Sequence, residues 1–252
     1  MLTSSFIFLP KISYKKEKQI WDSGIHKWDD FLAAEKVSSV NPLRKKIFDN
    51  LLIEAQQQLH ADNAKYFSKL FPNQETWRLY NHFKENTCYL DIETSGYYGD
   101  VTVVGISDGV ETKTMVKGIN LDAGLLKKTL AEYQMIVTFN GSSFDLPVIK
   151  RYLGEVIPAV PHVDLRHCCS RIGLTGGLKK IEKELGIKRA DEVAEMQGSD
   201  AVYLWQMWKT TGNRKYLDLL VQYNEEDILN LKPLAEYTYK NLKEKLQIFK
   251  SW

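Results

Sequence analysis

The sequence changes from a helical to a strand-like pattern at Thr87-Cys88-Tyr89-Leu90-Asp91-Ile92-Glu93. Apart from its acids the stretch is largely apolar, which predicts a strand in the interior of a sheet. Residues two apart in a strand point to the same face, so Asp91 and Glu93 are predicted to share one face. Two such carboxylates resist ionisation unless a cation neutralises them, and hard cations such as Mg²⁺ prefer oxygen ligands. On its own, the pair is more simply explained as two solvated turn residues after a strand that ends at Leu90.

Downstream of this strand, the sequence alternates between further strands and helices. Asp108-Gly109 is a strong hairpin signal between two of the strands. The predicted order is strands at 101–107 and 111–116, a helix at 121–133, a strand at 135–139, a helix to 153, a strand at 162–165, and then helices. This order predicts an α/β fold with a mixed five-stranded sheet flanked by helices.

Upstream of residue 86 the pattern is helical and contains one glycine, Gly24. We predict a small N-terminal helical domain at 1–80 and a main domain at 86–245, with Asn41-Pro42 starting one of the first helices. The segment 9–13 followed by a helix looks like a degenerate helix-hairpin-helix motif. Lys11 and Ser13 stand where that motif has glycines that bring backbone amides to a phosphate, so a structural role is favoured.

Composition limits the possible classes of protein. The 252 residues are 44% hydrophobic and 26% charged, as in an ordinary globular protein, and the formal net charge is +2. Nucleic-acid binding would therefore need a local positive surface. The apolar run 6–9 is ended by Pro10 and is too short for a signal core, and no stretch is long enough to span a bilayer. Three cysteines, Cys88, Cys168 and Cys169, lack disulfide or zinc spacing, so we predict a reduced, cytoplasmic chain without membrane contact.

Two later segments carry further carboxylates. Asp145 follows a buried-type strand and opens a helix, which is where sites form in sheet-and-helix folds. Alone, Asp145 is more simply explained as the N-cap of that helix. Tyr223 and Asp227 are one helical turn apart, so the phenol and the carboxylate share a face. Alone, this pair is typical of an ordinary acidic helix surface.

Taken in order, the three segments resemble the exonuclease motifs of the DEDD superfamily of 3′→5′ exonucleases. The motifs are Asp91-x-Glu93, Asn140-x-x-x-Phe144-Asp145 and Tyr223-x-x-x-Asp227. A tyrosine in the third motif is similar to the DEDDy branch, which includes the proofreading domains of many DNA polymerases. From Cys88 to about Leu242 the chain resembles the YprB-type ribonuclease H-like domains, and 162–165 with 177–182 is similar to their middle region. That group often has histidine at the position of Tyr223.

The resemblance implies a ribonuclease H-like fold and a metal-dependent nuclease. Asp91, Glu93, Asp145 and Asp227 would hold two divalent ions, Mg²⁺ or Mn²⁺, which activate water and stabilise the leaving 3′-oxygen. Tyr223 would orient the attacking water, since a phenol with a pKa near 10 is a poor base at neutral pH. The implied substrate is a nucleic acid with a single-stranded 3′ end, with DNA favoured over RNA.

Several other polar and aromatic residues are candidates for substrate contact. Asn140 and Phe144 could line the path of the terminal nucleotide, although core packing is favoured for Phe144. Lys179 and Lys183 share a helix face and could meet phosphates, or simply be solvated. Asp164 is a possible fifth carboxylate, with capping of the next helix favoured.

Two other functions remain open from the sequence. One is an endonuclease of the same fold that cuts structured junctions or RNA–DNA hybrids. The other is a catalytically silent nucleic-acid-binding module, which would not need an intact set of four acids.

Overall fold

A computed structural model of the chain describes residues 1–96 and 99–246. Its centre is a five-stranded sheet in the order β3-β2-β1-β4-β5. β1 pairs antiparallel with β2 and parallel with β4, so the predicted mixed sheet is confirmed. The strands are β1 (Thr87–Thr94), β2 (Val101–Ser107), β3 (Thr112–Val116), β4 (Met135–Thr138) and β5 (His162–Asp164).

The central position of β1 comes from its apolar residues. Cys88, Leu90 and Ile92 are buried and point to one face, where they pack against α6 (Ala123–Leu130) and α7 (Asp145–Leu153). Tyr89 points to the other face and joins a different hydrophobic cluster. The alternation places Asp91 and Glu93 on the Tyr89 face, as period-two geometry requires.

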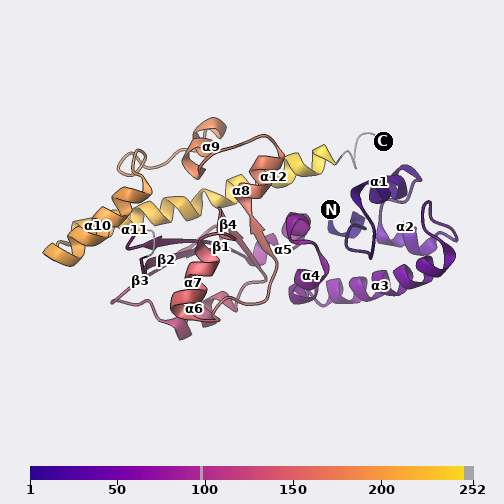
Figure 1. Cartoon of the computed structure of the whole chain (residues 1–252), viewed down its shortest axis with the longest axis horizontal. Helices are drawn as coiled ribbons and strands as arrows, with labels where there is room; N and C mark the ends of the chain where they lie inside the picture. The colour runs from indigo at the N-terminus through magenta and orange to yellow at the C-terminus, as the bar shows by residue number, and fades with distance from the viewer. Residues whose placement is uncertain (97–98, 247–252) are drawn as a thin grey trace.

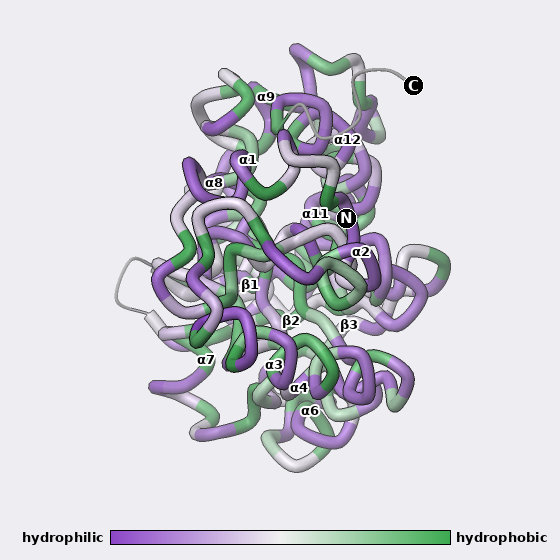
Figure 2. Tube along the Cα trace, turned by 90° about the vertical axis from the view of Figure 1, so that its right-hand side faces the viewer, coloured by the Kyte–Doolittle hydropathy of each residue, from purple (hydrophilic) through white to green (hydrophobic). Residues whose placement is uncertain are grey.

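The helices that follow β5 cover this second face of the sheet, whereas α6 and α7 lie on the opposite side (Figure 1). Leu217 and Leu220 of the long helix after α10 pack against Val103 of β2. In Figure 2 green, hydrophobic residues recur along the strands at the centre, and many purple, hydrophilic residues lie on the helices around them. The helices are α8 (Leu165–Arg171), α9 (Leu178–Leu185), α10 (Gly198–Thr211), α11 (Arg214–Leu229) and α12 (Leu231–Lys245).

The N-terminal segment is helical, as predicted, and its hydrophobic residues share a cluster with Tyr89, Val137 and Leu165 of the sheet region. The division into domains at 1–80 and 86–245 stays a prediction. The proposed start at Asn41-Pro42 is confirmed, with the Asn41 side chain accepting from the backbone N–H of Arg44. The segment contains η1 (Leu2–Ser4), α1 (Tyr14–Asp22), α2 (Trp28–Ala33), α3 (Pro42–His60), α4 (Ala64–Leu70), η2 (Asn73–Leu79), α5 (Tyr80–Phe83) and η3 (Lys84–Asn86).

The loop before α1 has the local geometry of a turn built around a buried acid. Lys11 has φ +62°, a left-handed value that glycine adopts more readily. The fully buried Glu17 accepts hydrogen bonds from the backbone N–H groups of Phe6 and Ile7 at 2.7 and 2.9 Å, and pairs with Arg78 at 2.8 Å. Backbone amides of this loop therefore serve an internal carboxylate, which favours the structural role.

The three cysteines are free and buried. Cys168 and Cys169 lie in α8, and burial raises the pKa of both thiols to about 12. Over residues 1–96 and 99–246, the structure contains no helix with the length and apolar character that a bilayer crossing requires.

Candidate active site

The site begins with the two acids of β1. Asp91 is opposite Gly105 of β2 in the antiparallel register, and Glu93 is opposite Val103. Both acids therefore lie over the central strands, and neither is a solvated turn residue. The simpler explanation of the Asp-x-Glu pair, a strand that ends at Leu90, is excluded because β1 continues to Thr94.

Helix α11 brings the third acid to the same face of the sheet. Tyr223 and Asp227 are both buried on it, one turn apart as predicted, so they are not part of an exposed acidic surface. The helix can approach because β2 has a glycine at the crossing. A Cβ on Gly105 would lie 2.0 Å from Oδ1 of Asn224 and 2.3 Å from Cδ1 of Ile228.

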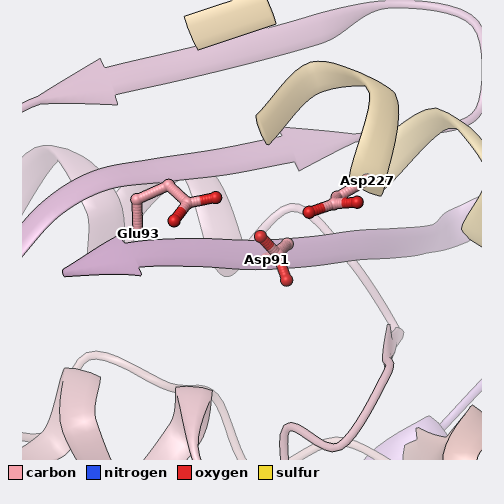
Figure 3. A group of neighbouring side chains, drawn as sticks. All are labelled: Asp91, Glu93 and Asp227. Carbon is pink, nitrogen blue, oxygen red and sulfur yellow. The ribbon is translucent and has the colours of Figure 1, made fainter. Parts of the chain in front are cut away.

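Three carboxylates converge at this crossing. One oxygen from each of Asp91, Glu93 and Asp227 lies within 4.8 Å of the others. Figure 3 shows Asp91 and Glu93 rising from the same strand and pointing, with Asp227 of the helix, toward a common space. In addition, Nδ2 of Asn224 donates to Oδ2 of Asp91 at 2.9 Å. The long-range convergence of these three acids is thus a feature of the structure.

Asp145 stands beside this group and is held separately. It is the first residue of α7, and the N-cap is Phe144, so the N-cap explanation of Asp145 is wrong. Its Oδ1 instead accepts from the backbone N–H of Ile92 at 3.1 Å. That N–H is available because the pairing of β1 with β4 runs only from Thr87 to Tyr89.

The electrostatics of the β1 acids reflect crowded negative charge. Burial, followed by the charges of Asp145, Asp227 and Glu93, raises the pKa of Asp91 well above its usual value. Burial and the charges of Asp227 and Asp145 likewise raise the pKa of Glu93. Burial raises the pKa of Asp145 to about 7, although hydrogen bonds from backbone N–H groups oppose the shift. The positive charge of Lys179 opposes the shift at Glu93 but does not overcome it.

Asp227 differs because an arginine is paired with it. Burial raises the pKa of Asp227, but the charge of Arg189 opposes this effect. Nη2 of Arg189 donates to Oδ1 of Asp227. The same guanidinium donates to both carboxylate oxygens of Glu182, at 2.6 and 2.8 Å. Glu182 and Arg189 are thus a buried pair attached to the edge of the acidic cluster.

Tyr223 and Lys179 lie together at the same edge. The ammonium of Lys179 is 4.6 Å from the centre of the Tyr223 ring, a cation–π contact. Within the described residues, Nζ of Lys179 is buried and has no hydrogen-bond partner. Burial raises the pKa of Tyr223 above its ordinary value, so its hydroxyl stays protonated at neutral pH.

The remaining predicted substrate residues have other contacts in the structure. The Asn140 Oδ1 accepts from Nη1 of Arg166 at 2.8 Å, and Phe144 packs against the α6–α7 side of the sheet. Asp164 accepts from the backbone N–H groups of Asn140 and Arg166, which confirms that it caps α8. Lys183 is exposed on α9. The structure thus supports packing for Phe144, and nothing tests the substrate roles of Asn140 and Lys183.

The family model described as the RNase H superfamily matches residues 88–239, more than half of the chain. The chain belongs to the RNase H superfamily. The predicted ribonuclease H-like α/β fold is therefore confirmed, and this fold with its acidic cluster supports a nuclease-type function on nucleic acid.

Among curated proteins, the comparison finds no match. Among solved structures, this RNase H-superfamily chain is similar to the family B DNA polymerase from the hyperthermophilic archaeon Pyrobaculum calidifontis. The TM-score is 0.48 and the sequence identity 16%, over 64% of this chain. The match spans 25% of the polymerase chain.

The carboxylate set fits divalent metal ions. Asp91, Glu93 and Asp227 offer closely spaced oxygen ligands, which Mg²⁺ and Mn²⁺ prefer. Burial and neighbouring acids raise the pKa values of Asp91 and Glu93, and a bound cation would relieve this crowding by favouring the ionised carboxylates. Asp145 is close enough to add to this charge.

Three residues of the RNase H site were not singled out from the sequence. Asn224 lies three positions before Asp227, so helical spacing could have placed it on the same face. Arg189 and Gly105 carried no local signal. The contact of Arg189 with Asp227 crosses 38 positions, and the need for Gly105 arises only where α11 crosses β2.

Proposed function

We propose that this RNase H-superfamily protein is a metal-dependent 3′→5′ exonuclease that hydrolyses phosphodiester bonds at nucleic-acid 3′ ends. The observation that supports this function best is the convergence of Asp91, Glu93 and Asp227, with Asp145 alongside. The 3′→5′ direction and the tyrosine-type assignment rest on the resemblance of the three motifs to the DEDD exonucleases. A single-stranded 3′ end, with DNA favoured over RNA, is the proposed substrate.

Asp91, Glu93, Asp145 and Asp227 would hold two Mg²⁺ or Mn²⁺ ions. When bound, such ions lower the pKa of a water molecule and stabilise charge on the leaving 3′-oxygen. The protein fixes one oxygen of three of these carboxylates with its own donors. Asn224 holds Oδ2 of Asp91, the Ile92 N–H holds Oδ1 of Asp145, and Arg189 holds Oδ1 of Asp227.

Tyr223 would act as a hydrogen-bond donor that orients the attacking water. Its raised pKa excludes a role as a general base near neutral pH. Lys179, whose ammonium lies over the Tyr223 ring, holds this ring in place and keeps positive charge near Glu93.

A basic groove beside the site supports a nucleic-acid substrate. Its volume is about 410 Å³, and Lys179 and Arg189 belong both to its lining and to the edge of the carboxylate site. Lys180 and Lys183 also line it, so its four basic residues outnumber its two acids, Glu182 and Glu195. We propose that phosphates of the bound strand lie in this groove.

End-labelled single- and double-stranded DNA and RNA, each with Mg²⁺, Mn²⁺ or EDTA, test the proposal. We expect metal-dependent release of mononucleotides from the labelled 3′ end, fastest on single-stranded DNA. The matched control is Asp91→Asn, which removes a charged ligand but keeps an acceptor for Asn224, and it should be inactive. Internal fragments would instead support an endonuclease, and binding without cleavage would support a silent binding module.

A further inference from the structure

The pair of Glu182 and Arg189 is buried beside the carboxylate cluster without belonging to it. The Arg189 Nε and Nη2 atoms bind the two oxygens of Glu182 side-on, at 2.6 and 2.8 Å. Nη2 also donates to Oδ1 of Asp227. The Glu182 and Arg189 side chains are 2% and 5% exposed. The two parallel hydrogen bonds to Glu182 fix the plane of the guanidinium group, so Arg189 reaches Asp227 from a fixed position.

Two roles toward a divalent cation are conceivable for this arginine. As a substitute cation, Arg189 would occupy the place of a metal ion and would have to leave when the ion binds. As a fixed support, it would stay and orient Asp227. The two-point contact with Glu182 favours the fixed support, because departure would leave a buried carboxylate without its partner.

Two of the other carboxylates of the site, Asp91 and Asp145, follow the same arrangement. Asn224 fixes one oxygen of Asp91, and the backbone of Ile92 fixes one oxygen of Asp145. Donors outside the metal's own ligand set commonly orient the ligands in this way. Arg189 completes the pattern at Asp227.

We propose that Arg189, anchored by Glu182, is a positioning residue that orients Asp227 for a divalent cation. This inference rests on the proposed function, because it requires a metal ion at the carboxylates. The Glu182–Arg189 pair has no net charge, and its proposed contribution is the orientation of Asp227 through the hydrogen bond from Arg189. Glu182 also lies on α9, so the same contact ties the lysine-bearing helix to the site.

The test is metal affinity in a charge-balanced double variant, Glu182→Gln with Arg189→Met. Net charge is unchanged, and replacing both members of a buried pair is often tolerated by the fold. Mn²⁺ binding would be measured by the electron paramagnetic resonance signal of the free ion, with circular dichroism to check folding. We expect binding roughly 10–100-fold weaker than in the wild-type protein, the usual effect of losing such a support.

The matched control is Asp218→Asn with Arg214→Met, which removes an exposed ion pair of α11 with the same change in charges. It should bind Mn²⁺ as the wild type does. Arg189→Lys keeps the charge but lacks the two-point contact, so it should also bind more weakly, and it carries the test if the double variant does not fold.

Equal or tighter Mn²⁺ binding by the Arg189 variants would overturn the inference, and tighter binding would identify a substitute cation. If the wild-type protein cleaves with metal while these variants bind normally, only the inference fails. If the wild-type protein binds no Mn²⁺, the proposed metal site fails together with it.

Discussion

At the scale of single residues, the site places several buried carboxylates close together with few hydrogen-bond donors to them. Burial and neighbouring acids raise the pKa values of Asp91 and Glu93. Both residues stay close together nevertheless, because strand β1 carries them. Tyr223 differs in having a hydroxyl that stays neutral and a ring that contacts Lys179. The ring and the hydroxyl can therefore be tested separately.

Tyr223→Phe keeps the ring beneath Lys179 and removes only the hydroxyl. If that hydroxyl orients the attacking water, the cleavage rate should fall by roughly 10–10³-fold, about 1.4–4 kcal/mol of activation free energy. Mn²⁺ affinity should be nearly unchanged, because the phenol is not proposed as a ligand. Single-turnover rates on a labelled DNA strand measure the effect, with Tyr216→Phe on the same helix as the control. An unchanged rate would assign Tyr223 to packing alone.

At the scale of elements, the docking of α11 on β2 assembles the site. Gly105 allows the helix to come close enough for Asn224 to reach Asp91. The same crossing places Asp227 beside the β1 acids. A small change in the distance between helix and sheet would thus affect fold and site together.

Gly105→Ala should destabilise the protein by about 1–3 kcal/mol, because the new Cβ would lie 2.0 Å from Oδ1 of Asn224. Urea unfolding measures this loss. Mn²⁺ binding should weaken as well, since a displaced Asn224 no longer holds Asp91. Gly198→Ala is the control, because a Cβ there meets nothing within 4 Å. Similar stability for the two variants would show that α11 does not depend on the close approach.

At the scale of the whole molecule, the metal-free protein carries opposing pH effects. The raised carboxyl pKa values mean that the folded state binds more protons than the unfolded state. Their stabilising contribution is therefore present at low pH and is lost as the pH rises through the folded values, about 7 for Asp145. Burial lowers the pKa of His162 to about 4, so the folded state favours the neutral imidazole. The stabilising contribution of His162 is therefore present above about pH 6.5 and is lost as the pH falls from there toward 4.

Above pH 6.5 the stability of the metal-free protein changes with pH through the carboxyl groups, whereas the contribution of His162 is constant. In EDTA we expect the Tm at pH 8.5 to be at least about 2–4 °C lower than at pH 6.5. This corresponds to a loss of about 1 kcal/mol or more in the free energy of unfolding. Mg²⁺ or Mn²⁺ should raise the Tm most at the higher pH, because the ions bind the ionised carboxylates. Asp91→Asn should show a smaller pH effect and a smaller response to metal. A Tm in EDTA that is constant or rises over this range would contradict the charge crowding.

The sequence by itself determined the sheet and the identity of the acids. Alternation in 87–93, the hairpin signal at Asp108-Gly109 and the helical spacing of Tyr223 and Asp227 are local patterns. The strand and the helical pair appear where they were predicted, and the hairpin forms with its turn one residue later, because β3 begins at Thr112 rather than at 111. They can be predicted because period and turn chemistry depend on neighbouring residues alone.

Only the tertiary structure decided how the acids are held. Asp145 by itself fitted a helix cap, but the unpaired N–H of Ile92 binds it instead. Arg189 and Gly105 became part of the site only through the packing of α9 and α11 against the sheet region. Such contacts join residues far apart in the chain, and their distances depend on how whole elements pack, which no local pattern encodes.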